Sequence, residues 1–314
     1  MRLAKITSSR PLLFFFTLLL MLATWFSPAP AFSAEQTSGV VGILISREIL
    51  PYLQMVQGLE ENLEQSSARI YLDKAGKPYS QESRLQELKP SDFGVMVAVG
   101  PQALSFLRDR HWPGTVLYTM VLNPGRFFWE GARIYGISLN LSPWKQLLTV
   151  AKIFPKVARL GILFNPEKNL KWFQQAKTVM TFKRLSLVPL KVNQRSDIPK
   201  LFIHPGPQVD AILFIPDQTV ISRSMITYVI KESLRLGIAT FGFNRFFYES
   251  GAALSFIIDY HTIGQNIARM LQSLANGGRC DSTGPPFSVL LNQKAVKALG
   301  LTMPQQLPEG VIIE

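Results

Sequence analysis

The sequence predicts an α/β fold in which short buried strands of parallel sheets alternate with helices, and three observations support this. Short apolar runs, such as 160–164, recur along the chain and are too brief for helices. Several of them stop at a turn pair such as Asn165-Pro166, and helix-permissive sequence follows. At 314 residues, the chain exceeds the roughly 100–200 residues of one typical domain. We therefore expect two lobes built from repeated strand–helix units with parallel-rich sheets.

The expected strands share this pattern of an apolar run closed by a turn. They are 40–45, 70–72, 93–99, 116–121, 160–164, 187–192, 211–215, 239–241, 252–256 and 287–291. In an open α/β sheet, the loops at the carboxyl ends of the strands face the ligand crevice, so the polar residues that follow each strand are candidates for binding.

Helices are expected between these strands, where apolar residues recur at helical spacing or a capping residue precedes the segment. The clearest start is Ser142, a good N-cap, followed by Pro143, which suits the first helical position. The expected helices are 51–65, 80–88, a short one through 107, one from 142, 168–180, one after 197, 222–236, 261–275 and 293–299. The chain is expected to cross first between the lobes near 135–140, an extended segment that contains a glycine.

The first 34 residues have the pattern of a cleaved secretory signal peptide. Basic residues precede an apolar run, 11–26, and small residues follow it, with cleavage expected between 31 and 34. An uncleaved membrane anchor is the alternative, although the run is shorter than the ~20 residues of a spanning helix. The single cysteine, Cys280, lies far from the cleavage site and cannot carry a lipid there. We therefore expect a soluble periplasmic protein, with Cys280 a surface or loop residue.

Charge and motifs exclude several other classes of protein. The net charge is +12, but lysines and arginines are scattered through the chain, which argues against a nucleic-acid partner. The histidines are His111, His204 and His261, isolated from one another, and no glycine-rich phosphate or dinucleotide loop follows a strand. We therefore expect no enzymatic activity, no metal site and no cofactor.

A series of motifs, in this order and spacing, resembles a known family. The motifs are 98–103, 136–138, 161–167, 209–212, 215–220, 251–254 and 292–300. They are similar to those of the substrate-binding proteins of ABC importers whose better-known members bind aromatic amino acids, which have a type I periplasmic-binding fold. The resemblance covers roughly 40–304.

The resemblance implies two αβα lobes with parallel-rich sheets, joined by a hinge. They are an N-terminal lobe of residues 36–138 plus 258–284 and a C-terminal lobe of 139–257 plus 285–314, with closure expected about segments near 135–140, 241–250 and 282–287. A small-molecule ligand would be held between them and handed to an ABC permease in the inner membrane, with its ATPase. We expect the protein to be monomeric. A periplasmic ligand-sensing module of the same fold, signalling to a membrane receptor, is the alternative.

The resemblance also implies which side chains contact ligand, and departures from the family pattern put the ligand type in question. Asp217 would pair with an ammonium group. In contrast, Arg245, next to the aromatic residues Phe241, Phe243, Phe246, Phe247 and Tyr248, would suit a flat or anionic ligand. The candidate ligand-binding residues are Ser46, Glu48, Gly100, Pro101, Gln102, Asn123, Ser138, Asn165, Glu167, Asn169, Asp217, Gln218, Thr219, Asn244, Arg245 and Asp259.

Overall fold

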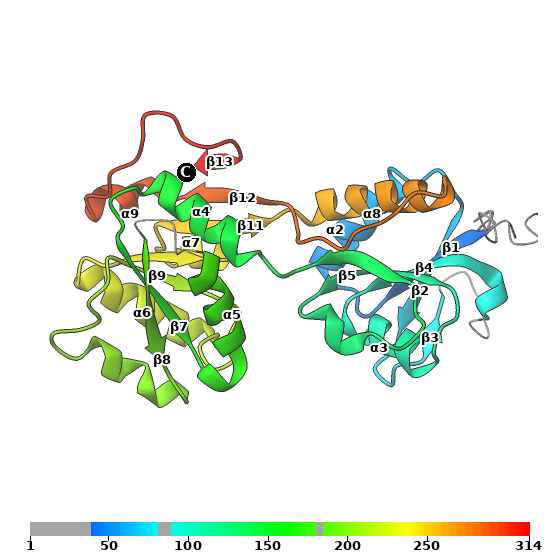
Figure 1. Cartoon of the computed structure of the whole chain (residues 1–314), viewed down its shortest axis with the longest axis horizontal. Helices are drawn as coiled ribbons and strands as arrows, with labels where there is room; N and C mark the ends of the chain where they lie inside the picture. Colours follow the sequence, from blue (N-terminus) through cyan, green and yellow to red (C-terminus); the bar gives the residue numbers. More distant parts are fainter. Residues whose placement is uncertain (1–38, 81–88, 180–184) are drawn as a thin grey trace, which may run out of the picture. The chain divides into compact units, whose positions relative to one another are not determined.

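The computed structural model describes residues 39–80, 89–179 and 185–314, and these form two mainly parallel β-sheets with helices on both faces of each (Figure 1). The predicted α/β class is confirmed. The signal peptide expected at 1–34 lies outside the described residues, as does nearly all of the helix expected at 80–88. Within the described residues, no helix is both long and apolar enough to cross a membrane.

The first sheet has the strand order β3-β2-β1-β4-β5-β6 and is parallel except for the short pair β2 and β3. Its strands are β1 (Val40–Ile45), β2 (Ser67–Leu72), β3 (Pro78–Tyr79), β4 (Phe93–Val99), β5 (Thr115–Val121) and β6 (Ile134–Ser138). The central strands are buried on both sides, which explains their nearly continuous apolar sequence.

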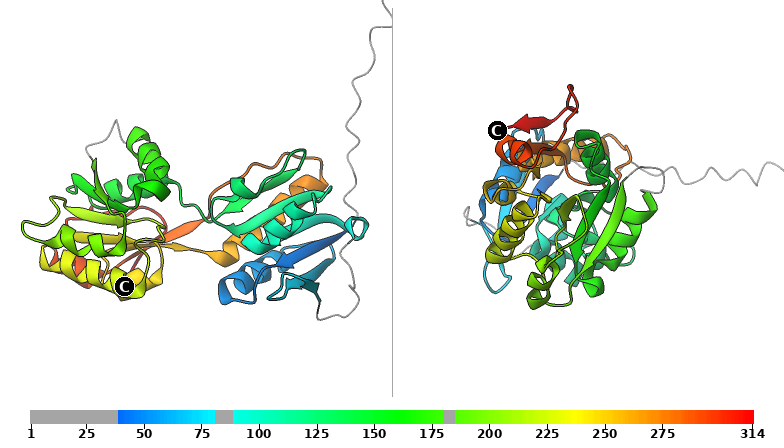
Figure 2. Two further views of the ribbon diagram at one scale, coloured as in Figure 1. Left: turned by 90° about the horizontal axis from the view of Figure 1, so that it is seen from below. Right: turned by 90° about the vertical axis from the view of Figure 1, so that its left-hand side faces the viewer.

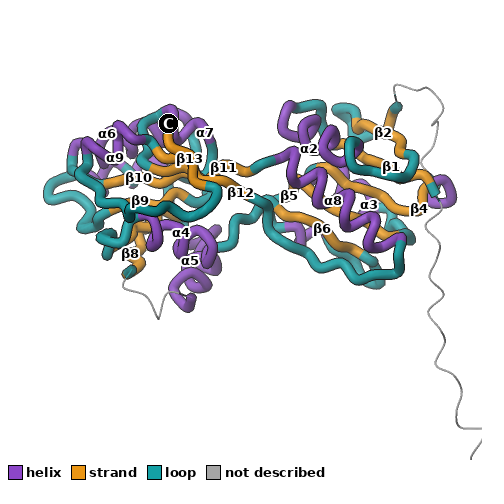
Figure 3. Tube along the Cα trace, turned by 90° about the horizontal axis from the view of Figure 1, so that it is seen from above, coloured by secondary structure: helices purple, strands orange, loops and turns teal. Residues whose placement is uncertain are grey.

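Helices α2 (Leu50–Glu60) and α8 (Tyr260–Ala275) lie side by side on one face of this sheet, and α3 (Pro101–Asp109) covers the other (Figures 1 and 3). The close approach of α2 and α8 depends on two glycines. A Cβ atom on Gly58 would lie 2.2 Å from the His261 carbonyl oxygen, and one on Gly264 would lie 2.0 Å from that of Met55. Any side chain at either position would force the helices apart.

The second sheet has the order β13-β12-β11-β10-β9-β7-β8, with only β11 and β12 antiparallel. Its strands are β7 (Arg159–Phe164), β8 (Ser186–Lys191), β9 (Ala211–Phe214), β10 (Ala239–Gly242), β11 (Leu254–Ile258), β12 (Phe287–Leu291) and β13 (Val311–Ile313). Its helices are α4 (Pro143–Ile153), α5 (Pro166–Val179), α6 (Arg223–Arg235), α7 (Arg245–Glu249) and α9 (Gln293–Ala298).

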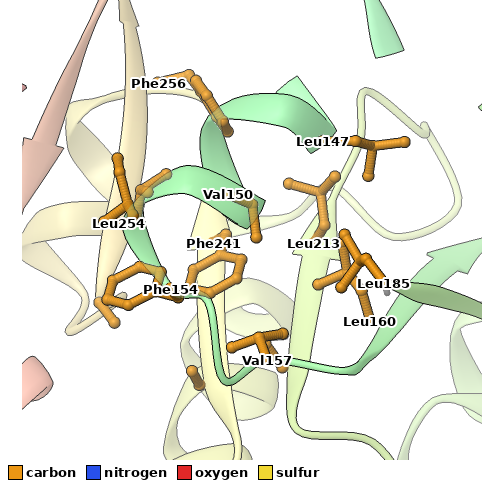
Figure 4. Close-up of a cluster of buried hydrophobic side chains, with 14 of the residues drawn as sticks. Leu147, Val150, Phe154, Val157, Leu160, Leu185, Leu213, Phe241, Leu254 and Phe256 are labelled. Atoms are coloured by element: carbon orange, nitrogen blue, oxygen red, sulfur yellow. The ribbon is translucent and has the colours of Figure 1, made fainter. Parts of the chain in front are cut away.

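Strand β7 contributes to the hydrophobic cores on both faces of the second sheet because its successive side chains point to opposite faces. Leu160, Ile162 and Phe164 pack with α4, α5 and α9, whereas Leu163 packs with α6 and α7. In the first of these cores the rings of Phe154 and Phe241 stack with centroids 5.3 Å apart (Figure 4). The whole run at 160–164 is therefore buried, as its composition predicts.

The chain passes three times between the two sheets (Figure 2). It leaves β6 for α4, leaves β11 for α8, and returns from α8 to β12. On this last passage Thr283 pairs with β6: its N–H donates to the Gly136 carbonyl, and its carbonyl accepts from Ser138, both at 3.0 Å. The crossings expected near 135–140 and 282–287 are therefore present.

The structure corrects some of the expected elements. The hinge segment expected at 241–250 is wrong, since this segment forms the end of β10 and α7 within the part of the chain built on the second sheet. The chain crosses at 258–259, after β11, next to the lobe boundary expected between 257 and 258. The helix expected after 197 is two short 3-10 turns, at Arg195–Asp197 and Pro199–Phe202, because Pro199 interrupts the segment. The sequence patterns missed β3, α7 and β13, all of five residues or fewer.

Candidate functional site

The loops after β7 and β9 meet around the carboxylate of Asp217. One of its oxygens accepts hydrogen bonds from the Asn165 backbone N–H (2.8 Å) and the Asn169 side-chain amide (2.7 Å). The other accepts from the Thr219 backbone N–H at 2.8 Å. Asp217 is only 1% exposed. Three donors from its own loops therefore occupy this carboxylate, and in this conformation it has little capacity left for a ligand ammonium group.

Asn165 and Thr219 join the same network. The Asn165 amide nitrogen donates to the Asn193 carbonyl at 3.0 Å and to the Thr219 hydroxyl at 3.2 Å, while its oxygen accepts from the Glu167 N–H at 2.9 Å. Lys168 Nζ also donates to the Thr219 hydroxyl, at 3.2 Å. The network thus connects the strand ends to the first turn of α5.

The outer members of these loops are exposed. Glu167 and Gln218 are accessible to solvent, and only the backbone of Gln218 is held. The Arg195 guanidinium donates to the carbonyls of Gln218 (3.4 Å) and Thr219 (3.3 Å). This arrangement adds a cation beside the strand ends.

The candidate residues on the first sheet fall into a separate group at the ends of β1 and β4. The buried hydroxyl of Ser46 accepts from the Ala103 N–H at 2.8 Å and so caps α3, for which the N-cap residue Gly100 has no side chain. Gly100 has φ +91, a left-handed conformation that favours glycine. Glu48 accepts a 3.1 Å hydrogen bond from the Tyr79 hydroxyl.

These residues border a hollow of about 630 Å³ with charges of both signs. Its lining is Ser46, Arg47, Glu48, Leu72, Asp73, Lys74, Ala75, Gly76 and Gln102. Pro101, the first residue of α3, lines a neighbouring hollow of about 500 Å³ together with Gln102.

Asn123 and Ser138 lie where β5 and β6 end. The side chain of Asn140 holds Asn123 twice at 2.7 Å: its oxygen accepts from the Asn123 N–H, and its amide nitrogen donates to the Asn123 side-chain oxygen. The Ser138 hydroxyl accepts from the Asn140 N–H at 3.3 Å. The three residues stabilise the start of the crossing to α4.

The aromatic wall expected next to Arg245 is wrong for Phe241 and Phe247, which are completely buried. Phe247 packs in the α6–α7 core against Phe214 and Phe243, because α7 turns it inward. Arg245 points elsewhere, forming an exposed ion pair with Glu314 at 3.4 Å. The preceding residue, Asn244, is an exposed N-cap without a side-chain hydrogen bond to α7.

Asp259 caps α8. Its carboxylate accepts from the Thr262 N–H (3.0 Å) and the Thr262 hydroxyl (2.7 Å). Partial burial alone would raise the pKa of Asp259, but these hydrogen bonds outweigh burial and hold the pKa below its ordinary value. Cys280 is buried rather than exposed, and burial raises the pKa of its thiol.

A third hollow, which we call the α4–α5 hollow, has a volume of about 510 Å³, within the range of small-molecule sites. Its lining includes two of the candidate residues, Asn123 and Asn169. The complete lining is Leu122, Asn123, Leu139, Asn140, Leu141, Ser142, Pro143, Gln146, Lys168, Asn169, Lys171, Trp172, Gln175, Ile215, Pro216, Phe243 and Ile258.

Sequence reasoning missed seven polar or aromatic residues of this lining: Asn140, Ser142, Gln146, Lys168, Lys171, Trp172 and Gln175. Those on α5 follow a signal that could have revealed them, because positions 168, 171, 172 and 175 recur every three or four residues and share one face of a helix. A neighbouring face of α5 carries Phe173 and Ala176 into the core, and Trp172 packs at the edge of that core. Gln146 gave no such signal, since it is buried on α4 next to Leu147.

A family model described as "ABC transporter substrate binding protein" matches residues 127–310 of this chain, more than half of it. The chain belongs to this family of ABC transporter substrate-binding proteins. Membership assigns it a solute-binding role with a small-molecule ligand, in a family that is in general not enzymatic. In the residues that the structure describes, no group of three histidine, cysteine, aspartate or glutamate residues could hold a metal ion.

Solved structures share the fold of this substrate-binding protein at low sequence identity. The ligand-free, open structure of a substrate-binding protein with adhesive properties from Clostridium difficile has a TM-score of 0.67 at 17% identity, covering 88% of this chain and 99% of that one. An ABC domain from Streptococcus pneumonia in complex with L-Trp has a TM-score of 0.57 at 16% identity, with 87% and 99% covered.

A conserved domain protein from Vibrio cholerae O1 biovar El Tor gives a TM-score of 0.57 at 18% identity, covering 88% of this chain and 99% of that chain. Among curated proteins, no sequence matches this substrate-binding protein. The structural neighbours establish the type I periplasmic-binding fold.

Proposed function

We propose that this protein is the exported solute-binding component of an ABC importer, which captures a small organic ligand and delivers it to the permease. In this proposal the lobes are residues 36–138 plus 258–284 and residues 139–257 plus 285–314. They would close about the crossings near 139–142, 258–259 and 281–286, and ligand contacts with both would favour the closed state.

The observation that carries the proposal is the α4–α5 hollow at the first crossing, in a chain that belongs to the substrate-binding family. Its lining combines apolar surface with a few amide and ammonium groups, which is the usual composition of a small-molecule site. Export rests on the sequence pattern of residues 1–34 and on the family.

Thermal unfolding of the purified protein tests this role with a panel of aromatic and other amino acids, amines, nucleobases, sugars and organic acids. A ligand at about 100 times its Kd adds ~2.7 kcal/mol to the free energy of unfolding, which is a visible rise in Tm. Small-angle scattering with that ligand should show compaction. No shift with any class of ligand would contradict the proposal, and an unchanged scattering profile at saturation would contradict lobe closure.

A further inference from the structure

Given the proposed binding function, on which this inference rests, we propose that the α4–α5 hollow selects a planar organic carboxylate without an ammonium group. The residues that would distinguish this ligand are Gln146, Lys168, Lys171 and Trp172. Nothing in the resemblance to aromatic amino acid-binding proteins implies this preference, because an amino acid carries both charges.

The charges around the hollow favour an anion. Among the residues that the structure describes, its lining contains two lysines and no aspartate or glutamate. Three acids are adjacent in sequence to lining residues. Asp217 already accepts three hydrogen bonds from Asn165, Asn169 and Thr219, Asp259 caps α8 through Thr262, and Glu167 is exposed outside the lining. A ligand ammonium group would therefore lose its water without gaining a carboxylate partner, whereas a ligand carboxylate would meet lysine.

The two lysines are placed to act together. Lys168 and Lys171 are three residues apart on α5 and lie on the same side of the helix. Both are exposed. Lys168 Nζ donates to the Thr219 hydroxyl, a neutral acceptor. Because an ammonium group has three donors, it can keep this bond and still bind a carboxylate oxygen.

The shape of the hollow favours a flat ring. Trp172 follows Lys171 on α5 and is half-buried against the core beneath the second sheet, so its ring is held in place. Phe243 also lines the hollow and is held by its contact with Phe247, at 4.7 Å between centroids. Rigid aromatic surfaces favour a planar ligand by stacking or edge contact.

Gln146 places a buried hydrogen-bond donor at the wall of the hollow. It is only 1% exposed, and within the part of the chain that the structure describes its Nε2 atom has no hydrogen-bond partner. A buried donor without an acceptor destabilises the protein. A carboxylate oxygen in the hollow would provide that acceptor when the Gln146 side chain turns toward it. Binding would then remove the energetic penalty of the unpaired donor, and this gain would add to the affinity for the ligand.

Two other candidate regions, the surroundings of Arg245 and the hollow at the ends of β1 and β4, do not offer this combination. Arg245 forms an ion pair with Glu314, and two rings near it in sequence are completely buried. The hollow on the first sheet is lined by Arg47 and Lys74 but also by Glu48 and Asp73, so it has no preference for one sign of charge.

Three probes that share one ring test the inference: indole-3-acetate, L-tryptophan and tryptamine. They carry a carboxylate, both groups, and an ammonium group, respectively. We expect indole-3-acetate to raise Tm and to bind most tightly in calorimetry, L-tryptophan to bind more weakly, and tryptamine to cause no shift. Tighter binding of L-tryptophan or tryptamine overturns the inference, as does a result in which none of the three binds.

Lysine variants test whether the binding of the carboxylate depends on the lining of this hollow. Lys168→Gln combined with Lys171→Gln should weaken indole-3-acetate binding by about 10- to 100-fold, the loss expected for hydrogen bonds to a charged group. Lys177→Gln combined with Lys231→Gln removes the same charge from outside the lining and should leave affinity unchanged. Equal losses in the two double variants would mean that only the general positive charge attracts the anion, and would overturn the site.

Gln146 is tested by two changes of similar size. Gln146→Leu should raise the Tm of the ligand-free protein, because it removes the unpartnered donor, while weakening indole-3-acetate binding about tenfold. Gln146→Glu should weaken binding further by placing a negative charge at the wall. If Gln146 only supports α4, Gln146→Leu will instead lower Tm and keep the affinity, which would contradict its role.

These outcomes separate the inference from the proposed function. If an amine, a sugar or a zwitterionic amino acid from the wider panel raises Tm and the planar carboxylates do not, the protein is a binding protein with another specificity. If no compound in the wider panel raises Tm, both proposals fail.

Discussion

The loops around Asp217 and the face of α5 differ in how their polar groups are used. Around Asp217, almost every donor meets an acceptor from the same two loops, and the carboxylate is buried. On the face of α5 that lines the hollow, Lys168 and Lys171 are exposed, and the nearby Gln146 amide nitrogen has no hydrogen-bond partner among the described residues. A polar residue at a strand end can therefore belong to the scaffold. In our proposal, the ligand is bound instead by groups that still have free donors.

Of the three substitutions, Asp217→Ala is expected to have the largest effect on the free energy of unfolding. It leaves the N–H groups of Asn165 and Thr219 and the Asn169 amide without their acceptor, at about 1 kcal/mol or more each. We expect a loss of ~3 kcal/mol in the free energy of unfolding, measured in urea. Asp217→Asn, which keeps an acceptor oxygen, should cost clearly less. A loss below ~1 kcal/mol for Asp217→Ala would mean that this carboxylate is not part of the scaffold.

Asp259 gives a smaller effect of the same kind, and one that depends on pH. Asp259→Ala removes the cap of α8 and should cost ~1 kcal/mol at neutral pH. Because the pKa of Asp259 in the folded protein is below its unfolded value of roughly 4, the carboxylate stabilises the fold above that pH. This contribution should disappear as the pH falls through the folded pKa.

The control for this second prediction is Asp259→Asn, which retains a cap but not the charge. Urea unfolding of both proteins between pH 7 and pH 3 should show the wild type losing its advantage over the variant at the acidic end. An advantage that is constant across the range would show that the charge of Asp259 does not stabilise the helix.

The smallest effect is expected from Arg245→Ala. The ion pair with Glu314 is long, at 3.4 Å, and more than half of the arginine side chain is exposed, so solvent screens it. The free energy of unfolding should change by less than ~0.5 kcal/mol, and so should that of Glu314→Ala. Affinity for the ligand should also be unchanged in calorimetry. A loss of affinity in Arg245→Ala but not in Glu314→Ala would indicate that the ligand binds at α7, and would contradict a binding site on the face of α5.

The sequence predicted the fold well because burial of both faces leaves a strong pattern in central parallel strands. The run 160–164 is an example, since its residues supply two separate cores. It failed for short elements such as β13, whose three residues carry too little pattern, and for the aromatic residues near Arg245. Phe241 and Phe247 could equally have lined a site or filled a core, and only packing distinguishes these outcomes.

Part of the proposed site could be predicted from the sequence. Asn123 follows β5 and Asn169 lies in the first turn of α5 after β7, and both line the α4–α5 hollow. Ser46, Asp217 and Asp259 also follow strands, but they accept hydrogen bonds from Ala103, Thr219 and Thr262, respectively. No spacing in the sequence indicates which strand-end oxygen will accept from its own backbone.

By itself, the sequence determined the class of the fold, the order of its main strands and helices, and the family, since these depend on local periodicity and on motifs along the chain. The tertiary structure decided which side chains remain available to a ligand. Lys168, Lys171 and Trp172 come together because α5 turns one face to the core, and Gln146 joins them from α4. Contacts between separate helices and loops depend on how those segments pack, and local sequence patterns do not specify them.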